Sequence, residues 1–267
     1  MKYIDRSHLS RLVETDKLDE LDQAKAELLN KSPEERKQFI KDNADKCTAI
    51  KPALWQLGCG KCWYSEAEIQ VNEGQIEHYR PKNQVWKTSD LPDGYWWLAF
   101  DIENLMLAHS TCNMRKSDYL KKIKCGKGCY FPLKPGSQRA QNPGDEGLES
   151  PLLLNPTEPN DVKLITFDPS SGKPIVNEKN ISEDWDRERV NKTVDYYHLD
   201  EGTWNRNRKN IFVKSKKIRE KLEKYDPGST EYSEALEEAT IMLSPWSKFS
   251  TVIEHAFIIN GIYEKVS

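Results

Sequence analysis

Four side chains in the middle of the chain have the types and order of a hydrolytic site. Glu77 is followed directly by His78, and Asn104 and then Asn113 come further along the chain. A histidine whose pKa is near neutrality can take a proton from water, and a divalent metal ion can stabilise charge on a leaving oxygen. Carboxylate and amide oxygens are suitable ligands for Mg²⁺, so the four residues predict metal-assisted hydrolysis, the chemistry that cleaves a phosphodiester.

The order of these residues resembles the HNH nuclease family, in which two strands and a helix enclose one divalent metal ion. The segments that carry the resemblance are Ile76-Glu-His-Tyr-Arg-Pro81, Asn104-Leu105 and Cys112-Asn-Met-Arg-Lys116. The resemblance implies that His78 is the general base and that Asn104 holds it in its working tautomer. It also implies that Glu77 and Asn113 are ligands of a catalytic Mg²⁺ or Mn²⁺, which makes the chain a DNA endonuclease.

Basic residues beside the motif are expected to contact the phosphates of a nucleic acid. They are Arg80, Lys82, Arg115 and Lys116. The last two begin a basic run, 114–127, in which six basic residues accompany one acidic residue. Its position beside Asn113 favours phosphate contact. A second run, 206–224, holds nine basic residues and is either a solvated helix face or a second basic surface.

The cysteines suggest a structural zinc ion. Many members of the resembled family hold zinc with two Cys-x-x-Cys pairs, but here Ser65 takes the place of the second cysteine of the first pair. The closing pair is His109-x-x-Cys112. Because Cys59-Gly-Lys-Cys62 is itself such a pair, Cys59, Cys62, His109 and Cys112 form a possible Cys₃His set. The alternative is that zinc has been lost and side-chain packing replaces it.

The elements that must position these residues predict an α+β chain, with a ββα-metal (HNH) core embedded in mainly helical sequence. Strands are expected at 67–71 and 74–79, joined by a turn at 72–74, and a helix is expected from about residue 110. The aromatic segment 95–100 is expected to be core, and its sharper interpretation is base stacking.

Three regions follow from these patterns. They are an N-terminal helical cap at 1–57, the nuclease core at 58–135, and a loop-rich segment followed by helices at 136–267. The helices expected outside the core cover 15–30, 33–43, 50–57, 183–198, 203–225, 231–243 and a last one starting at 245. Short strands are expected at 152–154 and 164–168.

Composition limits how the chain can meet nucleic acid. Lys and Arg number 40 against 43 Asp and Glu, a net charge of −3, so any binding must use local basic patches. No apolar run approaches the ~18 residues of a membrane span, and no signal peptide is evident. The expected location is the cytoplasm, where paired cysteines more often indicate metal than a disulfide.

Further segments resemble one branch of the HNH family, the nuclease subunits of Septu-type and retron-linked antiphage systems. They are 76–82, 95–101, 131–133 and 149–156. The resemblance implies a role in bacterial antiphage defence beside an ATPase partner. Two alternatives stay open, namely a catalytically silent, zinc-stabilised nucleic-acid-binding or scaffold protein, and an HNH nuclease directed at RNA.

Overall fold

The computed structural model describes residues 1–89, 91, 93–118 and 122–266 as a mainly helical α+β protein. Within these residues the strands form three two-stranded antiparallel sheets. Lys121 of the expected basic run lies outside the described residues. No described helix combines the length and the apolar character needed to cross a bilayer.

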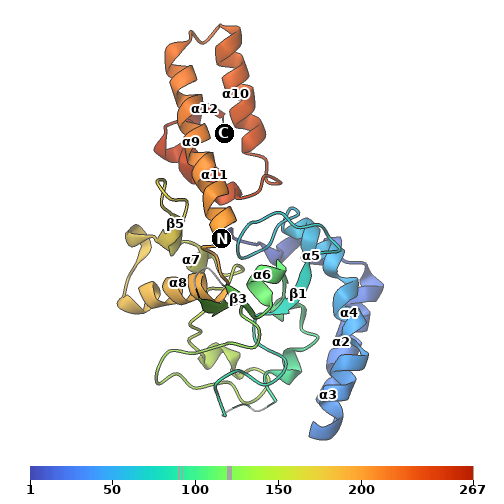
Figure 1. Ribbon diagram of the computed structural model, residues 1–267. Coiled ribbons are helices and arrows are strands. Elements are labelled where there is room, and N and C mark those ends of the chain that lie inside the picture. Colours follow the sequence, from blue (N-terminus) through green and yellow to red (C-terminus); the bar gives the residue numbers. More distant parts are fainter. Residues whose placement is uncertain (90, 92, 119–121, 267) are drawn as a thin grey trace.

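The N-terminal region is helical, as the sequence predicts. Its helices are α1 (Leu9–Leu12), α2 (Thr15–Leu29), α3 (Pro33–Asp42), α4 (Ala44–Ala49) and α5 (Lys51–Leu57). A capping box starts α3, because the Ser32 backbone N–H donates to the Glu35 side chain and the Ser32 side chain accepts from the backbone of Glu35. Figure 1 shows α2, α3 and α4 along one edge of the molecule, in blue.

The central ribbon joins β1 (Gln75–His78) to β2 (Leu105–Ala108), with Gln75 opposite Ala108 and His78 opposite Leu105. All four residues of β2 are buried. The ribbon leads directly into the single turn of α6 (Ser110–Asn113), which begins at the predicted residue. Strand 74–79 is therefore confirmed in position, and its partner is a segment well separated from it along the chain.

The strand expected at 67–71 is wrong. The structure has one isolated bridge there, between Lys61 and Glu68, inside a loop that carries two of the predicted zinc ligands and is called here the cysteine loop (residues 58–69). The Trp55 indole N–H donates to the Ile69 carbonyl at 2.7 Å, and the Ile69 N–H donates to the Gly60 carbonyl at 3.0 Å. The carbonyl and the N–H of Ile69 are therefore not available to pair with β1 in a two-stranded sheet.

Two short hairpins follow. One pairs β3 (Lys116–Asp118) with β4 (Ile123–Cys125), and the other pairs β5 (Ile165–Phe167) with β6 (Pro174–Val176). The second hairpin confirms the strand predicted near 164–168. The strand predicted at 152–154 is wrong, because its three leucines are buried but its backbone bonds to Pro132 and to a threonine hydroxyl instead of to a neighbouring strand.

The C-terminal region is again helical. It contains α7 (Pro159–Val162), α8 (Asp184–Tyr196), α9 (Gly202–Lys224), α10 (Thr230–Met242), α11 (Ser250–Ile259) and α12 (Tyr263–Val266). The predictions for α8, α9 and α10 are confirmed within two residues at each end. The helix expected from residue 245 begins instead at Ser250, because Phe249 has a left-handed φ of 56° that ends the preceding turn.

The segment 245–250 covers the cysteine loop. The ammonium of Lys61, which is 3% exposed, donates to the carbonyls of Pro245 and Ser247 and to the Ser250 hydroxyl. The Phe249 N–H donates to the Glu66 carbonyl at 3.0 Å. The cysteine loop is therefore held in place by a segment from the far end of the chain.

Two hydrophobic clusters stabilise the fold. The larger includes the buried aromatic residues Tyr95, Trp97 and Phe100, which confirms these three as core. Trp96 is half-buried, with the Arg36 guanidinium 3.6 Å from the centre of its ring. The smaller cluster lies between α9, α10, α11 and α12, and Figure 1 shows α9 and α10 side by side, extending away from the rest of the molecule.

Candidate active site

His78 is the last residue of β1 and its ring is fixed by one backbone carbonyl. Its Nε2 lies 2.9 Å from the Ala99 oxygen. A carbonyl can only accept a hydrogen bond, so Nε2 carries the proton and Nδ1 keeps a free lone pair. His78 also lines a cavity of about 410 Å³. The imidazole is therefore a neutral acceptor at the wall of an open cavity, which is the form that a general base requires.

The surroundings of His78 favour this neutral form. Burial lowers the pKa of the imidazole, the positive charges of Lys82 and Lys127 lower it further, and the bond to the Ala99 carbonyl opposes them in part. The resulting pKa is about 3. At neutral pH the ring is therefore unprotonated, although a pKa this far below neutrality also makes it a weak proton acceptor.

Asn104 forms hydrogen bonds to two backbone segments, one just after His78 and one just before Ala99. It can affect the orientation of the His78 ring only through these segments. Its amide nitrogen donates to the carbonyls of Arg80, at 2.9 Å, and Leu98, at 3.2 Å. Its amide oxygen accepts from the Arg80 N–H at 2.8 Å. Leu98 directly precedes Ala99, so Asn104 fixes the segment that carries the carbonyl bound to His78. The predicted orienting role is thus geometrically possible through the backbone.

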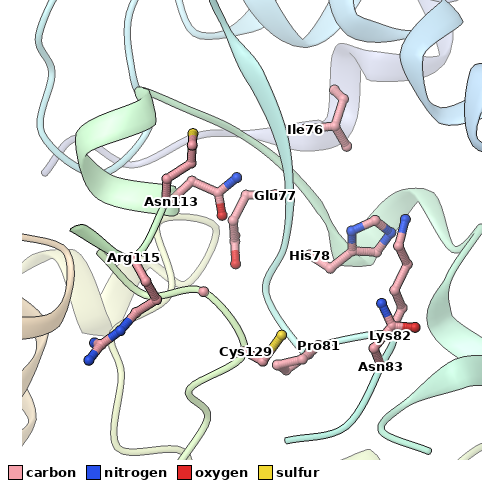
Figure 2. Close-up of a pocket in the computed structure, with 11 residues that line it drawn as sticks. Ile76, Glu77, His78, Pro81, Lys82, Asn83, Asn113, Arg115 and Cys129 are labelled. Atoms are coloured by element: carbon pink, nitrogen blue, oxygen red, sulfur yellow. The ribbon is translucent and has the colours of Figure 1, made fainter. Parts of the chain in front are cut away.

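Glu77 lies on the other side of the strand, as Figure 2 shows. It is 2% exposed, and both of its carboxylate oxygens have partners. The Tyr64 hydroxyl donates to Oε2 at 2.6 Å. The Lys127 ammonium donates to Oε1 and, at 2.6 Å, to the carbonyl of His78. The carboxylate is therefore neutralised by a buried ion pair within the chain itself.

Asn113, the last residue of α6, lies on the same side of β1 as Glu77 (Figure 2). Its amide nitrogen donates to the Gln75 side-chain oxygen at 3.0 Å. The predicted ligands Glu77 and Asn113 thus line one cavity. They do not fit a divalent ion as arranged, because Lys127 and Tyr64 already use both Glu77 oxygens and a metal would have to displace one of them.

The predicted zinc residues come together only in part. The sulfur atoms of Cys62 and Cys112 lie 3.8 Å apart in the core. His109 Nδ1 instead accepts from the Thr111 N–H at 3.0 Å and caps α6. Cys59 is half-buried and has a left-handed φ of 51°. Across the part of the chain that the structure describes, no three His, Cys, Asp or Glu side chains are placed to hold a metal ion.

The two thiols nevertheless form a polar contact of their own. Burial raises the pKa of Cys62, but contacts with the Cys112 thiol, with the His109 backbone and with Ser65 outweigh it and bring the pKa down to about 6. The pKa of Cys112 is raised by burial and by Cys62. The pKa values of the two thiols are thus shifted in opposite directions, with Cys62 the more acidic of the two.

The four predicted phosphate contacts divide into two groups. Lys82 and Arg115 line the same cavity as His78. Arg80 turns away, because its guanidinium donates to Glu149 at 2.7 Å and to the Glu146 carbonyl at 3.2 Å. Lys116 donates to the Thr111 hydroxyl at 2.7 Å and lines a neighbouring cavity. Arg80 therefore has a structural role in this arrangement. The other three line cavities, although Arg115 also donates to the Gly126 carbonyl at 3.1 Å.

A second cavity of about 410 Å³ shares Arg115, Gly128 and Cys129 with the first. Half of its lining residues are basic, and the lining includes Trp86, which is 43% exposed. The ammonium of Lys87 lies 4.5 Å from the Trp86 ring centre and the Arg115 guanidinium 4.9 Å. The two cavities make one groove of cations and apolar surface beside His78, and this groove is called the basic groove below.

Lys127 is a site residue that the sequence motif does not include, since the sequence places it only within a basic run. The available signal was its position in Cys125-Gly-Lys-Gly-Cys129, where two glycines flank one lysine. Both glycines have left-handed φ values, 86° and 53°. A side chain on Gly126 would overlap the Met114 carbonyl, so only glycine permits the close approach that inserts Lys127.

Comparison with known proteins finds a similar bacterial protein. The chain is a distant homologue of the Septu protein PtuB of Bacillus mycoides (strain KBAB4), with 34% identity over 139 residues. The alignment covers 48% of this chain and 43% of the relative, so the chain spans less than half of the length of the curated protein that it matches. No protein-family model and no solved structure matches the chain.

Proposed function

We propose that this protein is an HNH-type endonuclease that hydrolyses phosphodiester bonds of DNA. The observation that carries the proposal is the placement of His78, a neutral imidazole fixed on the Ala99 carbonyl beside the basic groove. A general base must be unprotonated, oriented and open to water. His78 is unprotonated at neutral pH, is oriented by the Ala99 carbonyl and lines the cavity, and these features support the proposal.

In the proposed reaction the Nδ1 atom of His78 removes a proton from a water molecule. The water oxygen forms a bond to phosphorus, and the bond between phosphorus and the leaving oxygen breaks with its electron pair on that oxygen. Lys82 and Arg115 lie on the cavity wall, where they would bind the phosphate and balance its charge. Asn104 keeps the Ala99 carbonyl in position through Leu98. Because both Glu77 oxygens are engaged, these steps use only residues of the chain.

The homology to a Septu protein supports a role in Septu antiphage defence, and we extend the proposal to an ATPase partner on the same ground. The proposal for the partner rests on this match, which covers 48% of the chain, and on the segments of the sequence that resemble Septu-type nuclease subunits.

The proposal is tested by incubating supercoiled plasmid with the purified protein, Mg²⁺ or Mn²⁺ and, in a parallel reaction, the ATPase partner. His78→Ala is the test variant. His8→Ala is the matched control, because His8 is an exposed histidine near the start of the chain. We expect nicking or linearisation by the parent and by His8→Ala, and none by His78→Ala. Cleavage by His78→Ala at the parental rate would contradict the assignment.

A second function, nucleic-acid binding without cleavage, is favoured by the buried Glu77–Lys127 pair, which leaves no carboxylate oxygen for a catalytic ion. It predicts that DNA binding by the parent equals that of His78→Ala and that neither cleaves with the partner present. A matched RNA substrate in the same assay tests the RNA-directed alternative, because cleavage of RNA alone would replace DNA as the substrate.

A further inference from the structure

Lys127 is a fully buried lysine, and lysine side chains are rarely buried unless they are paired. Its side chain is 0% exposed, and its ammonium lies between the Glu77 carboxylate and the carbonyl of His78. The loop that carries it is bound to the end of α6, because the N–H groups of Lys127 and Gly128 donate to the carbonyls of Cys112, at 2.8 Å, and Asn113, at 2.7 Å. The loop 125–129 thus contacts the Glu77 carboxylate and the backbone carbonyls of His78 and Asn113.

This arrangement conflicts with a divalent ion on Glu77. A divalent ion there would lie a few ångströms from a buried ammonium, where water screens the repulsion only weakly. It would also compete for Oε1, which the ammonium occupies. Either the lysine or the metal ion can neutralise the carboxylate, and the two charges together exceed what one carboxylate balances.

We propose that Lys127 occupies the cation position of Glu77, so that the Lys127–Glu77 pair and a bound divalent ion exclude one another. Metal loading then requires residues 125–129 to withdraw the ammonium. The inference rests on the proposed function only in taking Glu77 as the metal ligand. Gly128 and Cys129 form part of the wall of the basic groove, so movement of this loop would also change the groove in which substrate is expected to bind.

The first test measures Mn²⁺ binding by isothermal titration calorimetry, without DNA or partner. The proteins are the parent, Lys127→Gln and the double variant Glu77→Gln/Lys127→Gln. Glutamine keeps a hydrogen-bond donor near Glu77 but removes the positive charge. We expect Lys127→Gln to bind Mn²⁺ about tenfold more tightly than the parent or better, and the double variant to lose the gain. Equal affinity in parent and Lys127→Gln, or a gain that survives Glu77→Gln, would overturn the proposal.

The second test needs no variant and covers the case in which Lys127→Gln does not fold. The parent is treated with an amine-acylating reagent, without metal and at the Mn²⁺ concentration that calorimetry shows to be saturating, and labelled lysines are identified by mass spectrometry. Lys127 should be protected without metal and labelled with it. Lys61, also buried but bonded to the 245–250 segment, should be protected in both and serves as the internal control. Protection of Lys127 in the metal-saturated protein would overturn the proposal.

Neither measurement depends on cleavage. A protein that binds Mn²⁺ as expected and cuts no nucleic acid would retain the inference about Lys127 and lose the proposed function. A protein that cuts DNA through His78 and shows no competition between Mn²⁺ and Lys127 would retain the function and lose the inference.

Discussion

The two faces of β1 at its last two residues are built in opposite ways. On one face His78 is half-buried, bonded through a single nitrogen and open to a cavity. On the other, the adjacent Glu77 is buried, and both its oxygens are bonded to side chains within the chain. Neighbours in a motif are therefore not equally available for chemistry, because strand residues alternate between faces with different surroundings. The His78 ring borders a cavity, whereas the Glu77 carboxylate is closed off by Tyr64 and Lys127.

The largest expected effect is a loss of cleavage on substitution of His78, which lies on the face of β1 that borders the cavity. His78→Gln can still donate to the Ala99 carbonyl but cannot act as a base at neutral pH, so the chemical step loses its proton acceptor. We expect cleavage to fall by about 10²–10⁴-fold while the free energy of unfolding changes little. Single-turnover cleavage and urea denaturation measure the two quantities. A variant that loses stability and activity together would show that His78 is mainly structural.

The free energy of unfolding tests the face of β1 on which Glu77 is buried. Lys127→Met leaves a buried carboxylate without its cation, and we expect the free energy of unfolding to fall by about 3–5 kcal/mol. The double variant Glu77→Gln/Lys127→Met should be less destabilised, because a neutral amide can still accept from Tyr64. Urea denaturation in the presence of a chelator measures both. A double variant as unstable as the single one would mean that packing of the lysine stem, and not its charge, holds the loop.

Asn104 connects the base to the rest of the fold and should have a smaller effect. Asn104→Ala removes three hydrogen bonds in the core, and loss of the bond to Leu98 frees the carbonyl that orients His78. We expect kcat to fall about tenfold to a hundredfold with KM nearly unchanged, together with a loss of about 1–3 kcal/mol in stability.

Asn104→Asp is the matched variant for this position. It keeps an oxygen for the Arg80 N–H but has no donor for Leu98, so its kcat should fall as in Asn104→Ala. An aspartate variant with the parental kcat would remove the orienting role and leave Asn104 as a structural residue.

The smallest expected effect concerns the basic groove. Arg115→Ala should reduce the dependence of DNA affinity on salt by about one unit of the logarithmic slope, because one phosphate contact is lost. Lys216→Ala in α9 removes a charge that is 74% exposed and distant from the groove in sequence, and it should leave the slope unchanged. Fluorescence anisotropy over a range of salt concentrations measures both. Equal effects of the two variants would place the DNA on the second basic run.

Local signals in the sequence predict the helices and β1 well. Ser32 and Pro33 mark the start of α3, and apolar periodicity marks α8 and α9, because capping and amphipathic spacing act within a few residues. The partner of β1 was wrongly predicted because strand pairing depends on residues far apart along the chain. A local turn at 72–74 suggested a hairpin, whereas the buried β2 segment provides the actual partner.

The candidate site could be predicted only as far as its motif reaches. The positions of His78 and Asn104 follow from the resemblance, but the carbonyl of Ala99 that orients the base has no sequence signal, since every residue has a carbonyl. Lys127 is far from Glu77 along the chain, and a lysine is normally solvated, so spacing and composition both argued against a buried pair. Of the four predicted zinc ligands, the structure brings only Cys62 and Cys112 together. This outcome depends on the backbone conformation of the cysteine loop, which local sequence patterns do not determine.

The segment 245–250 has a consequence for the timing of biosynthesis. It supplies the carbonyls and the hydroxyl that hold Lys61 in the cysteine loop, yet it is synthesised long after Asn113 completes the motif. At ribosomal speeds of about 5–20 residues per second, this delay is on the order of ten seconds. Limited proteolysis of a chain truncated after residue 243 should reveal cleavage in the cysteine loop that the full chain resists. Premature termination before residue 245 would then release a polypeptide that contains the motif residues but lacks the segment that holds the cysteine loop in place.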